Sequence, residues 1–177
     1  VIAPRLGLAD TITEKLSIVA QVLEQTKGRA LVLFPSKEEM RQFKQASLMI
    51  PLFGAMDFKY EGDQEISHLI SSFQNDEHSI LCAVTLWEGL DVPGPSLSNV
   101  IIWSLPFPPN DPVFSAKRKA SDTPFEEVDL PYMLLRLRQG MGRLIRSRED
   151  RGIVVLLGQE VHHNELVKAK VKEILPK

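Results

Sequence analysis

The sequence predicts an α/β protein built on a largely parallel sheet, and two observations lead to that prediction. Short apolar runs alternate with segments of helical periodicity, which is the pattern of strands joined by crossover helices. Some runs are continuously apolar, such as Val100, Ile101 and Ile102, and strands of this kind are typical of a parallel sheet covered on both faces. The 177 residues suit one domain, and five strands interleaved with helices are expected within it.

The expected strands are short and are bounded by turn or helix signals. The segment 29–35 (RALVLFP) is predicted to be a buried strand. Pro51 makes the next apolar run an edge strand, because proline cannot donate to a central ladder. The complete set of predicted strands is 29–35, 48–53, 79–84, 99–105 and 152–157.

The expected helices have recognisable first residues. Ser36 is predicted to cap a helix whose first turn holds Glu38 and Glu39, both favourable at a helix N-terminus. Pro131 is predicted to be the first residue of another helix, because the backbone N–H at that position has no acceptor within the helix and proline lacks this N–H. Between the elements, 106–112 (PFPPNDP) is interpreted as a surface connection and 122–129 as an acidic loop. The predicted helices are 11–25 (capped by Asp10 or Thr11), 37–45, 64–74, 131–147 and 165–175.

The composition is that of an ordinary globular protein, with 44% hydrophobic and 25% charged residues. No window approaches the roughly 20 apolar residues of a membrane span, and no signal peptide opens the sequence, so no membrane partner is expected. A net charge of −2 argues against strong nucleic-acid binding by this chain alone, because phosphate neutralisation supplies most of that affinity. It allows a few local phosphate contacts.

Cysteine and histidine usage predicts no metal site. The single cysteine, Cys82, lies in an apolar run, where a small buried strand residue and a catalytic thiol are the two interpretations. One cysteine makes no internal disulfide, so the cytoplasm is the expected location. The histidines show no paired metal-ligand spacing; they are His68, His78, His162 and His163.

The helix after Pro131 carries the most informative segment, QGMGRLIR. At 100° per residue, Gln139, Arg143 and Arg146 fall within about 60° of one another, with leucines and isoleucine on the opposite side. Two glycines inside the helix cost roughly 2 kcal/mol relative to alanine, which close approach of a ligand or a backbone would offset. A solvated arginine face is the alternative interpretation, but planar guanidinium groups suit phosphate.

Two further segments follow predicted strands. In 85–95 (TLWEGLDVPGP), the turn at 88–91 places two carboxylates around a glycine, where one could meet a ribose hydroxyl or a partner arginine. Trp87 either stacks on a base or packs in the interior. Ser36 and Lys37 stand at a strand end beside a helix N-terminus, where they either hold a phosphate or serve as a cap and a surface lysine.

Taken together, these segments resemble superfamily 2 helicases of the XPD/DinG group, specifically their second RecA-like domain. QGMGRLIR resembles motif VI, LWEGLDVPG resembles motif V and LVLFPS resembles motif IV, while VIIWSLPFPPNDP is similar to the DinG segment between motifs V and VI. The resemblance runs from about residue 29 to 157. It implies that residues 1–177 form a single second RecA-like motor domain, a three-layer α/β fold with a mostly parallel sheet flanked by helices.

The resemblance also implies roles for individual residues. Arg143 and Arg146 match the motif VI arginines that reach the ATP phosphates as arginine fingers, which makes them the expected catalytic residues. The expected ATP-binding residues are Gln139, Gly89 and Asp91. The expected nucleic-acid-binding residues are Ser36, Lys37, Thr85 and Trp87. One departure is Gly158-Gln159-Glu160 after the last strand, where relatives often carry Asp-x-Arg.

The sequence contains neither a G-x-x-x-x-G-K-[ST] phosphate loop nor a D-E-A-H-like motif. In this family both belong to the first RecA-like domain, so that domain is expected to bind most of the ATP and Mg²⁺. An ATP-dependent DNA helicase is therefore expected only of the full-length protein, with single-stranded DNA as its partner. The alternative is a degenerate motor domain that regulates or docks an amino-terminal 3'-5' exonuclease, which some bacterial relatives carry. A self-sufficient small enzyme would need a complete catalytic set, and the sequence shows none.

Overall fold

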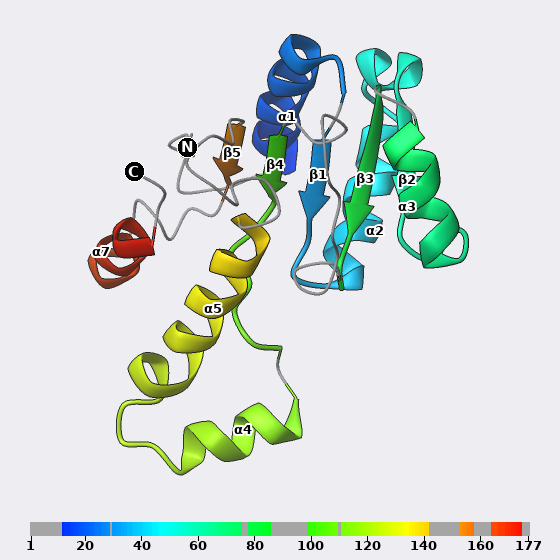
Figure 1. Cartoon of the computed structure of the whole chain (residues 1–177). Coiled ribbons are helices and arrows are strands. Elements are labelled where there is room, and N and C mark those ends of the chain that lie inside the picture. Colours follow the sequence, from blue (N-terminus) through cyan, green and yellow to red (C-terminus); the bar gives the residue numbers. More distant parts are fainter. Residues whose placement is uncertain are drawn as a thin grey trace.

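The computed structural model describes residues 12–28, 30–75, 78–85, 99–109, 111–141, 153–157 and 164–174. Its centre is a five-stranded sheet in the order β2-β3-β1-β4-β5, and every neighbouring pair is parallel (Figure 1). The central strand β1 aligns Val32 with Cys82 of β3 on one side and with Ile101 of β4 on the other. The strands are β1 (Ala30–Leu33), β2 (Asp57–Tyr60), β3 (Ser79–Ala83), β4 (Asn99–Ile102) and β5 (Ile153–Leu156).

Helices cover both faces of the sheet, so the domain has three layers. Alternate residues of β1 point to opposite faces, because successive strand side chains alternate. Leu31 and Leu33 pack with residues of α3, α5 and α7, whereas Val32 packs with residues of α1 and α2. The helices are α1 (Ile12–Thr26), α2 (Lys37–Ser47), α3 (Ile66–Asn75), α4 (Pro112–Lys119), α5 (Leu130–Met141) and α7 (Glu165–Ile174). The predicted three-layer α/β class is confirmed.

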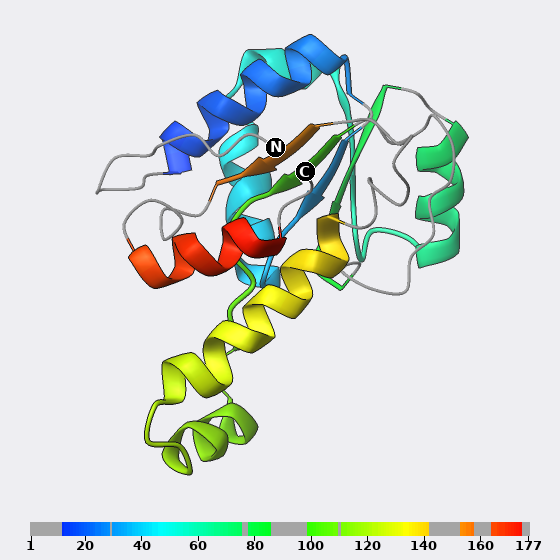
Figure 2. The same cartoon turned by 60° about the vertical axis from the view of Figure 1, so that its left-hand side comes forward.

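A helical arm projects from this core. Both views show α4 and the first turns of α5 extending away from the sheet (Figures 1 and 2). Inside the arm, the Arg118 guanidinium lies 2.8 Å from the Asp129 carboxylate, and the rings of Phe114 and Tyr132 meet edge to face at 5.0 Å. These contacts hold α4 against the start of α5.

Two predictions about the segments between the core elements are wrong. The run 48–53 is not a strand: it leads into the 3₁₀ helix η1 (Pro51–Ala55), and Leu48 and Met49 remain 82% and 81% exposed. The edge strand beside β3 is β2 instead, a half-polar segment of four residues that is too short for its alternation to predict a strand. The acidic segment 122–129 is not a loop throughout, because a π-helical turn (Phe125–Asp129) runs directly into α5.

The proline-rich segment 106–112 also differs from a simple surface connection. Pro106 and Pro108 are buried, and Asp111 caps α4, a helix that the periodicity did not predict. The other elements agree with the prediction to within a few residues. The part of the predicted helix 131–147 beyond Met141, and the proposed caps Asp10 and Thr11, lie outside the described residues.

Candidate functional site at the carboxyl edge of the sheet

The carboxyl ends of the strands form one edge, since all five strands are parallel. The pairing continues one residue past several strand ends: Phe34 N donates to Ala83 O at 2.9 Å and Trp103 N donates to Leu33 O at 3.0 Å. Segments that follow different strands are therefore brought side by side here. In open parallel sheets this is the edge at which ligands bind.

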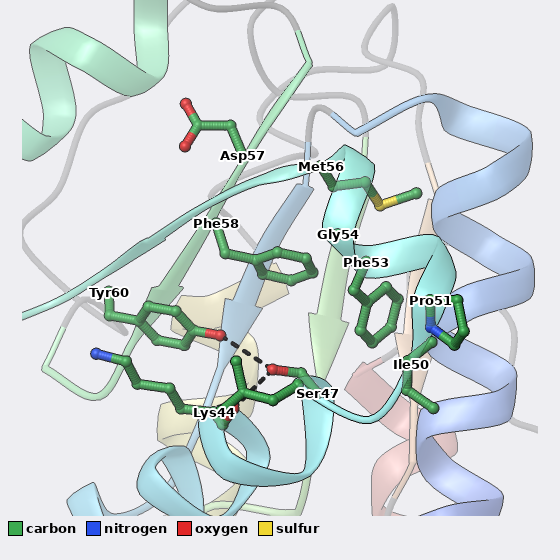
Figure 3. Close-up of a pocket in the computed structure, with 11 residues that line it drawn as sticks. Lys44, Ser47, Ile50, Pro51, Phe53, Gly54, Met56, Asp57, Phe58 and Tyr60 are labelled. Atoms are coloured by element: carbon green, nitrogen blue, oxygen red, sulfur yellow. Dashed lines mark hydrogen bonds between the residues drawn. The ribbon is translucent and has the colours of Figure 1, made fainter.

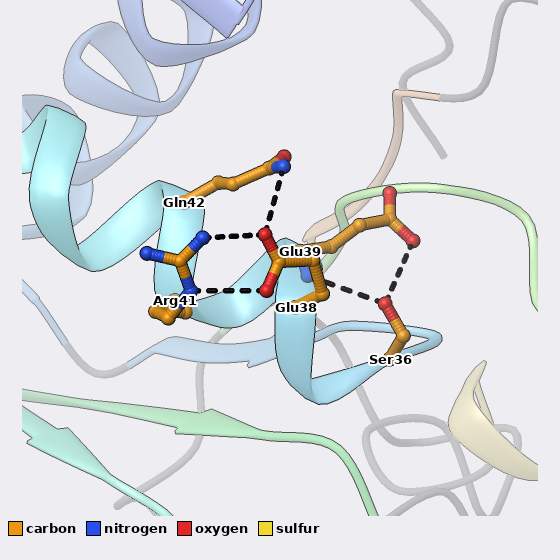
Figure 4. A network of polar contacts seen from close by, with 5 residues as sticks. All are labelled: Ser36, Glu38, Glu39, Arg41 and Gln42. Atoms are coloured by element: carbon orange, nitrogen blue, oxygen red, sulfur yellow. Dashed lines mark hydrogen bonds and ion pairs between the residues drawn. The ribbon is translucent and has the colours of Figure 1, made fainter.

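Ser36 caps α2 at this edge, as predicted. Its hydroxyl accepts from the backbone N of Glu39 at 3.2 Å and lies 3.4 Å from the Glu39 carboxylate (Figure 4). Lys37 is exposed at the first position of the helix. On the neighbouring surface, Arg41 donates to Glu38 at 2.9 and 2.5 Å, and this hydrogen bonding holds the pKa of Glu38 below its usual value.

A polar network ties Ser36 to the end of β4. Glu39 accepts a hydrogen bond from the Ser104 hydroxyl at 2.7 Å. The ammonium group of Lys15 donates to Ser104 Oγ and to the Trp103 carbonyl, both at 3.1 Å. Lys15 is only 8% exposed. The network therefore joins α1, β4 and the N-terminus of α2 at the carboxyl edge.

Lys15 and Ser104 also belong to this edge, although the sequence does not indicate it. The sequence indicates Glu39 only as a favourable charge in the first turn of α2. The pattern S-x-x-E at 36–39 is that of a capping box and could have linked Glu39 to Ser36. No sequence signal connects Lys15 with Ser104, because they lie 89 residues apart and meet only through the fold.

Thr85 also lies at this edge, two residues after β3, and its side chain is exposed. Its hydroxyl donates to a carboxylate oxygen of Glu61, the residue that follows β2. The other oxygen of Glu61 accepts from the backbone N of Val84 at 2.6 Å and of Thr85 at 2.9 Å. Glu61 was not singled out from the sequence, because its role depends on β2 lying beside β3.

Gln139 lies in the last described turn of α5 and is partly buried. The buried stripe of this helix consists of Leu130, Met133, Leu137 and Gly140. Gly140 thus lies on the packed face of α5, so close packing against the core accounts for a glycine at this position.

Five of the predicted site residues lie outside the described residues, and they are Gly89, Asp91, Trp87, Arg143 and Arg146. Of the predicted site residues within the described ranges, Ser36, Lys37 and Thr85 lie at the carboxyl edge of the sheet.

A pocket of about 410 Å³ lies away from these residues, between the C-terminal half of α2, η1 and β2 (Figure 3). Phe53, Phe58 and Tyr60 line it, with Lys44 4.7 Å from the centre of the Tyr60 ring. Burial raises the pKa of the Tyr60 hydroxyl, which lies 3.5 Å from the Ser47 hydroxyl. None of the described site residues Ser36, Lys37, Thr85 and Gln139 lines this pocket.

Cys82 is buried in β3, and desolvation raises the pKa of its thiol. A thiol held protonated is a poor nucleophile, which favours the interpretation as a packed strand residue. Within the described ranges, no three or more His, Cys, Asp or Glu side chains are grouped closely enough to hold a metal ion. Among the same residues, no helix has the length and apolar character that crossing a membrane requires.

A parallel five-stranded sheet between two helical layers, with polar side chains gathered at its carboxyl edge, defines a three-layer α/β domain of the doubly wound kind. The chain belongs to the family described as the helicase C-terminal domain, which matches residues 19–177. This membership confirms the resemblance to the C-terminal helicase domain of the DinG/XPD group.

Individual relatives carry helicase names. The chain is 53% identical over 169 residues to the probable ATP-dependent helicase YpvA of Bacillus subtilis, covering 92% of this chain and 25% of YpvA. It is 34% identical over 163 residues to the ATP-dependent DNA helicase YoaA of Haemophilus influenzae, covering 86% and 24%. A third relative, the 3'-5' exonuclease DinG of Bacillus subtilis, is 30% identical over 163 residues, covering 88% and 18%. The chain spans about a quarter of the length of the first two.

Solved structures agree on the fold. A structure of apo XPD superposes with a TM-score of 0.74 at 20% identity, covering 97% of this chain and 37% of that one. The C-terminal domain of the DEAD-box protein Dbp5 gives a TM-score of 0.63 at 15% identity, covering 97% and 83%. The fold is therefore that of a RecA-like helicase domain.

Proposed function

We propose that this chain is the C-terminal motor domain of an ATP-dependent DNA helicase of the DinG type. The observation that carries the proposal is the 53% identity, over nearly the whole chain, to a relative named a probable ATP-dependent helicase. The QGMGRLIR and LWEGLDVPG segments support it, because they resemble motifs VI and V and because QGMGRLIR holds arginines of the kind that stabilise charge on a transferring phosphoryl group. We place the protein in the cytoplasm.

Residues 1–177 act in this proposal as one unit whose partner is a first RecA-like domain elsewhere in the same protein. That partner supplies the phosphate loop, which this sequence does not contain, and binds most of the magnesium–ATP complex. Arg143 and Arg146 close over the phosphates and stabilise negative charge in the transition state. Gln139, Gly89 and Asp91 line the nucleotide side of the domain interface.

Single-stranded DNA is the proposed track. Ser36, Lys37 and Thr85 lie at one edge of the sheet, so a phosphate backbone that crosses this edge could meet all three. Trp87 follows Thr85 closely in the sequence and is the proposed stacking residue. Closing and reopening of the two domains on ATP would then move them along the single-stranded DNA.

The second candidate is a degenerate motor domain that docks or regulates an attached exonuclease. It is favoured by one relative, which is named a 3'-5' exonuclease. ATPase and strand-separation assays on the full-length protein separate the two candidates. Nuclease activity without ATP turnover would favour the docking role.

Arg146→Ala in the full-length protein tests the mechanism. Loss of a charge partner used in the transition state is expected to cut ATP turnover by at least about 10²-fold, with a much smaller change in ATP affinity. Arg146→Lys should rescue poorly, because lysine lacks the planar fork. Arg138→Ala is the matched control, since Arg138 is an exposed arginine of α5, and it should keep its turnover. Unchanged turnover in Arg146→Ala with a lowered melting temperature would make Arg146 structural.

A further inference from the structure

The carboxylate of Glu61 occupies a corner of the carboxyl edge. Glu61 follows edge strand β2, and its backbone N donates to Cys82 O at 2.9 Å, which fixes it beside the end of β3. One carboxylate oxygen accepts from Val84 N at 2.6 Å and from Thr85 N at 2.9 Å, and the other accepts from the Thr85 hydroxyl. Three donors on two consecutive residues thus converge on one anionic group.

This donor set suits a phosphate as well as a carboxylate. Successive backbone N–H groups at a turn form a concave nest that binds anions, and a hydroxyl adds a third donor. Charge-assisted hydrogen bonds of this kind serve either anion. Thr85 is exposed, so a phosphate can reach the corner from solvent.

The other hydroxyl of the proposed track is held differently. Ser36 lies 3.4 Å from the carboxylate of Glu39, a longer contact than those of Glu61. The other carboxylate oxygen of Glu39 accepts from the Ser104 hydroxyl at 2.7 Å, so this carboxylate is shared between two hydroxyl groups on different segments. The contacts made by the Glu61 carboxylate, in contrast, converge on the Val84–Thr85 corner. Glu61 is therefore the carboxylate whose position conflicts most directly with a phosphate.

We propose that the Val84–Thr85 corner is a phosphate-binding site of the DNA track and that Glu61 is its intramolecular competitor. Glu61 holds the two N–H groups and the hydroxyl while the domain is free, and a backbone phosphate displaces it when DNA binds. This inference rests on the proposed DNA-binding function. Its consequence is a weaker apparent affinity, because the apparent dissociation constant equals the intrinsic one divided by the fraction of molecules in which Glu61 leaves the corner open.

Removing the competitor should therefore tighten binding. Glu61→Gln in the full-length protein keeps the size of the side chain but removes its charge. Binding to a fluorescein-labelled oligo(dT) strand is measured by anisotropy. The expected gain in affinity is about five- to tenfold, which corresponds to a closed fraction of about 80 to 90% in the wild-type protein.

Glu65→Gln is the matched control. It removes the same charge four residues further along, from an exposed carboxylate that accepts from the Ser67 hydroxyl at 3.0 Å. The change in its affinity for oligo(dT) measures the general effect of removing one negative charge. The gain in affinity of Glu61→Gln should exceed that change several-fold. Glu61→Asp keeps the charge but shortens the reach by one methylene. It should also tighten binding, and it replaces Glu61→Gln if melting curves show that variant to be unfolded.

The outcomes separate this inference from the proposed function. If wild type binds oligo(dT) and Glu61→Gln binds no better than Glu65→Gln, Glu61 is a structural clamp and the inference is overturned while the DNA-binding function stands. If neither the wild type nor Glu61→Gln binds, the proposed function fails, and the inference fails with it. Binding by Glu61→Gln that exceeds both wild type and Glu65→Gln supports the competitor.

Discussion

Gly28 is the position at which a single added methyl group should damage the fold most clearly. It lies in the turn between α1 and β1 with a φ of +91°, a region that L side chains rarely adopt. A Cβ built there would stand 2.3 Å from the carbonyl oxygen and 2.6 Å from the carbonyl carbon of His78. The turn is also tied by its own carbonyl, which accepts from Thr26 Oγ1 at 2.9 Å and from Asn99 Nδ2 at 3.3 Å.

The cost of Gly28→Ala can be worked from these contacts. The left-handed backbone conformation lowers the free energy of unfolding by about 1–2 kcal/mol when the residue has a Cβ. The overlap needs a backbone shift of about 1 Å, comparable to overpacking that costs typically 1–3 kcal/mol. The smaller entropy of the unfolded alanine chain offsets about 0.4–1 kcal/mol. The net loss is about 3 kcal/mol, which lowers the melting temperature of a chain of this size by about 6–12 °C.

Two other glycines provide matched controls. Gly62 has a φ of +99° but open space around its Cβ position, so Gly62→Ala should lose only about 1 kcal/mol, the backbone part. Gly54 has neither feature, and Gly54→Ala should be neutral or slightly stabilising. Thermal and urea unfolding followed by circular dichroism measures all three. A Gly28→Ala stability within about 0.5 kcal/mol of Gly62→Ala would refute the steric argument.

Three further outcomes are expected. Residues 1–177 alone should show negligible ATPase activity with or without single-stranded DNA, because the sequence has no phosphate loop, and robust magnesium-dependent turnover would contradict the split site. The same chain should bind single-stranded DNA weakly and with steep salt dependence, as its net charge of −2 implies, and nanomolar binding at physiological salt would argue for a basic groove. Phe43→Ala should lose about 3–5 kcal/mol of unfolding free energy, because Phe43 is fully buried, with its ring centre 5.3 Å from that of Phe34 and 5.2 Å from that of Trp103. Val113→Ala, at a residue 61% exposed, is its control and should change stability by less than about 0.5 kcal/mol.

The candidate site was only partly predictable. Ser36 and Thr85 were found because each follows a buried strand, and the rule for parallel sheets assigns ligands to that edge. The partners of these residues were not found. Glu61 and Ser104 are ordinary residues in the sequence, and they gain a role only when β2 lies beside β3 and β4 lies beside β1.

The sequence by itself determined the fold class, the buried strands and the helix cap of α2. These features depend on local patterns: continuous apolar runs such as 100–102 leave no polar face, and Ser36 satisfies an N–H three residues away. The order of the strands and the identity of the edge strand were decided by the tertiary structure. The run at 48–53 is more apolar than the half-polar β2 and therefore resembles a strand more closely in sequence. In the structure, however, β2 pairs with β3, and Leu48 and Met49 stay exposed. Strand propensity reflects the surface on which a segment packs, and that surface exists only once distant segments have come together.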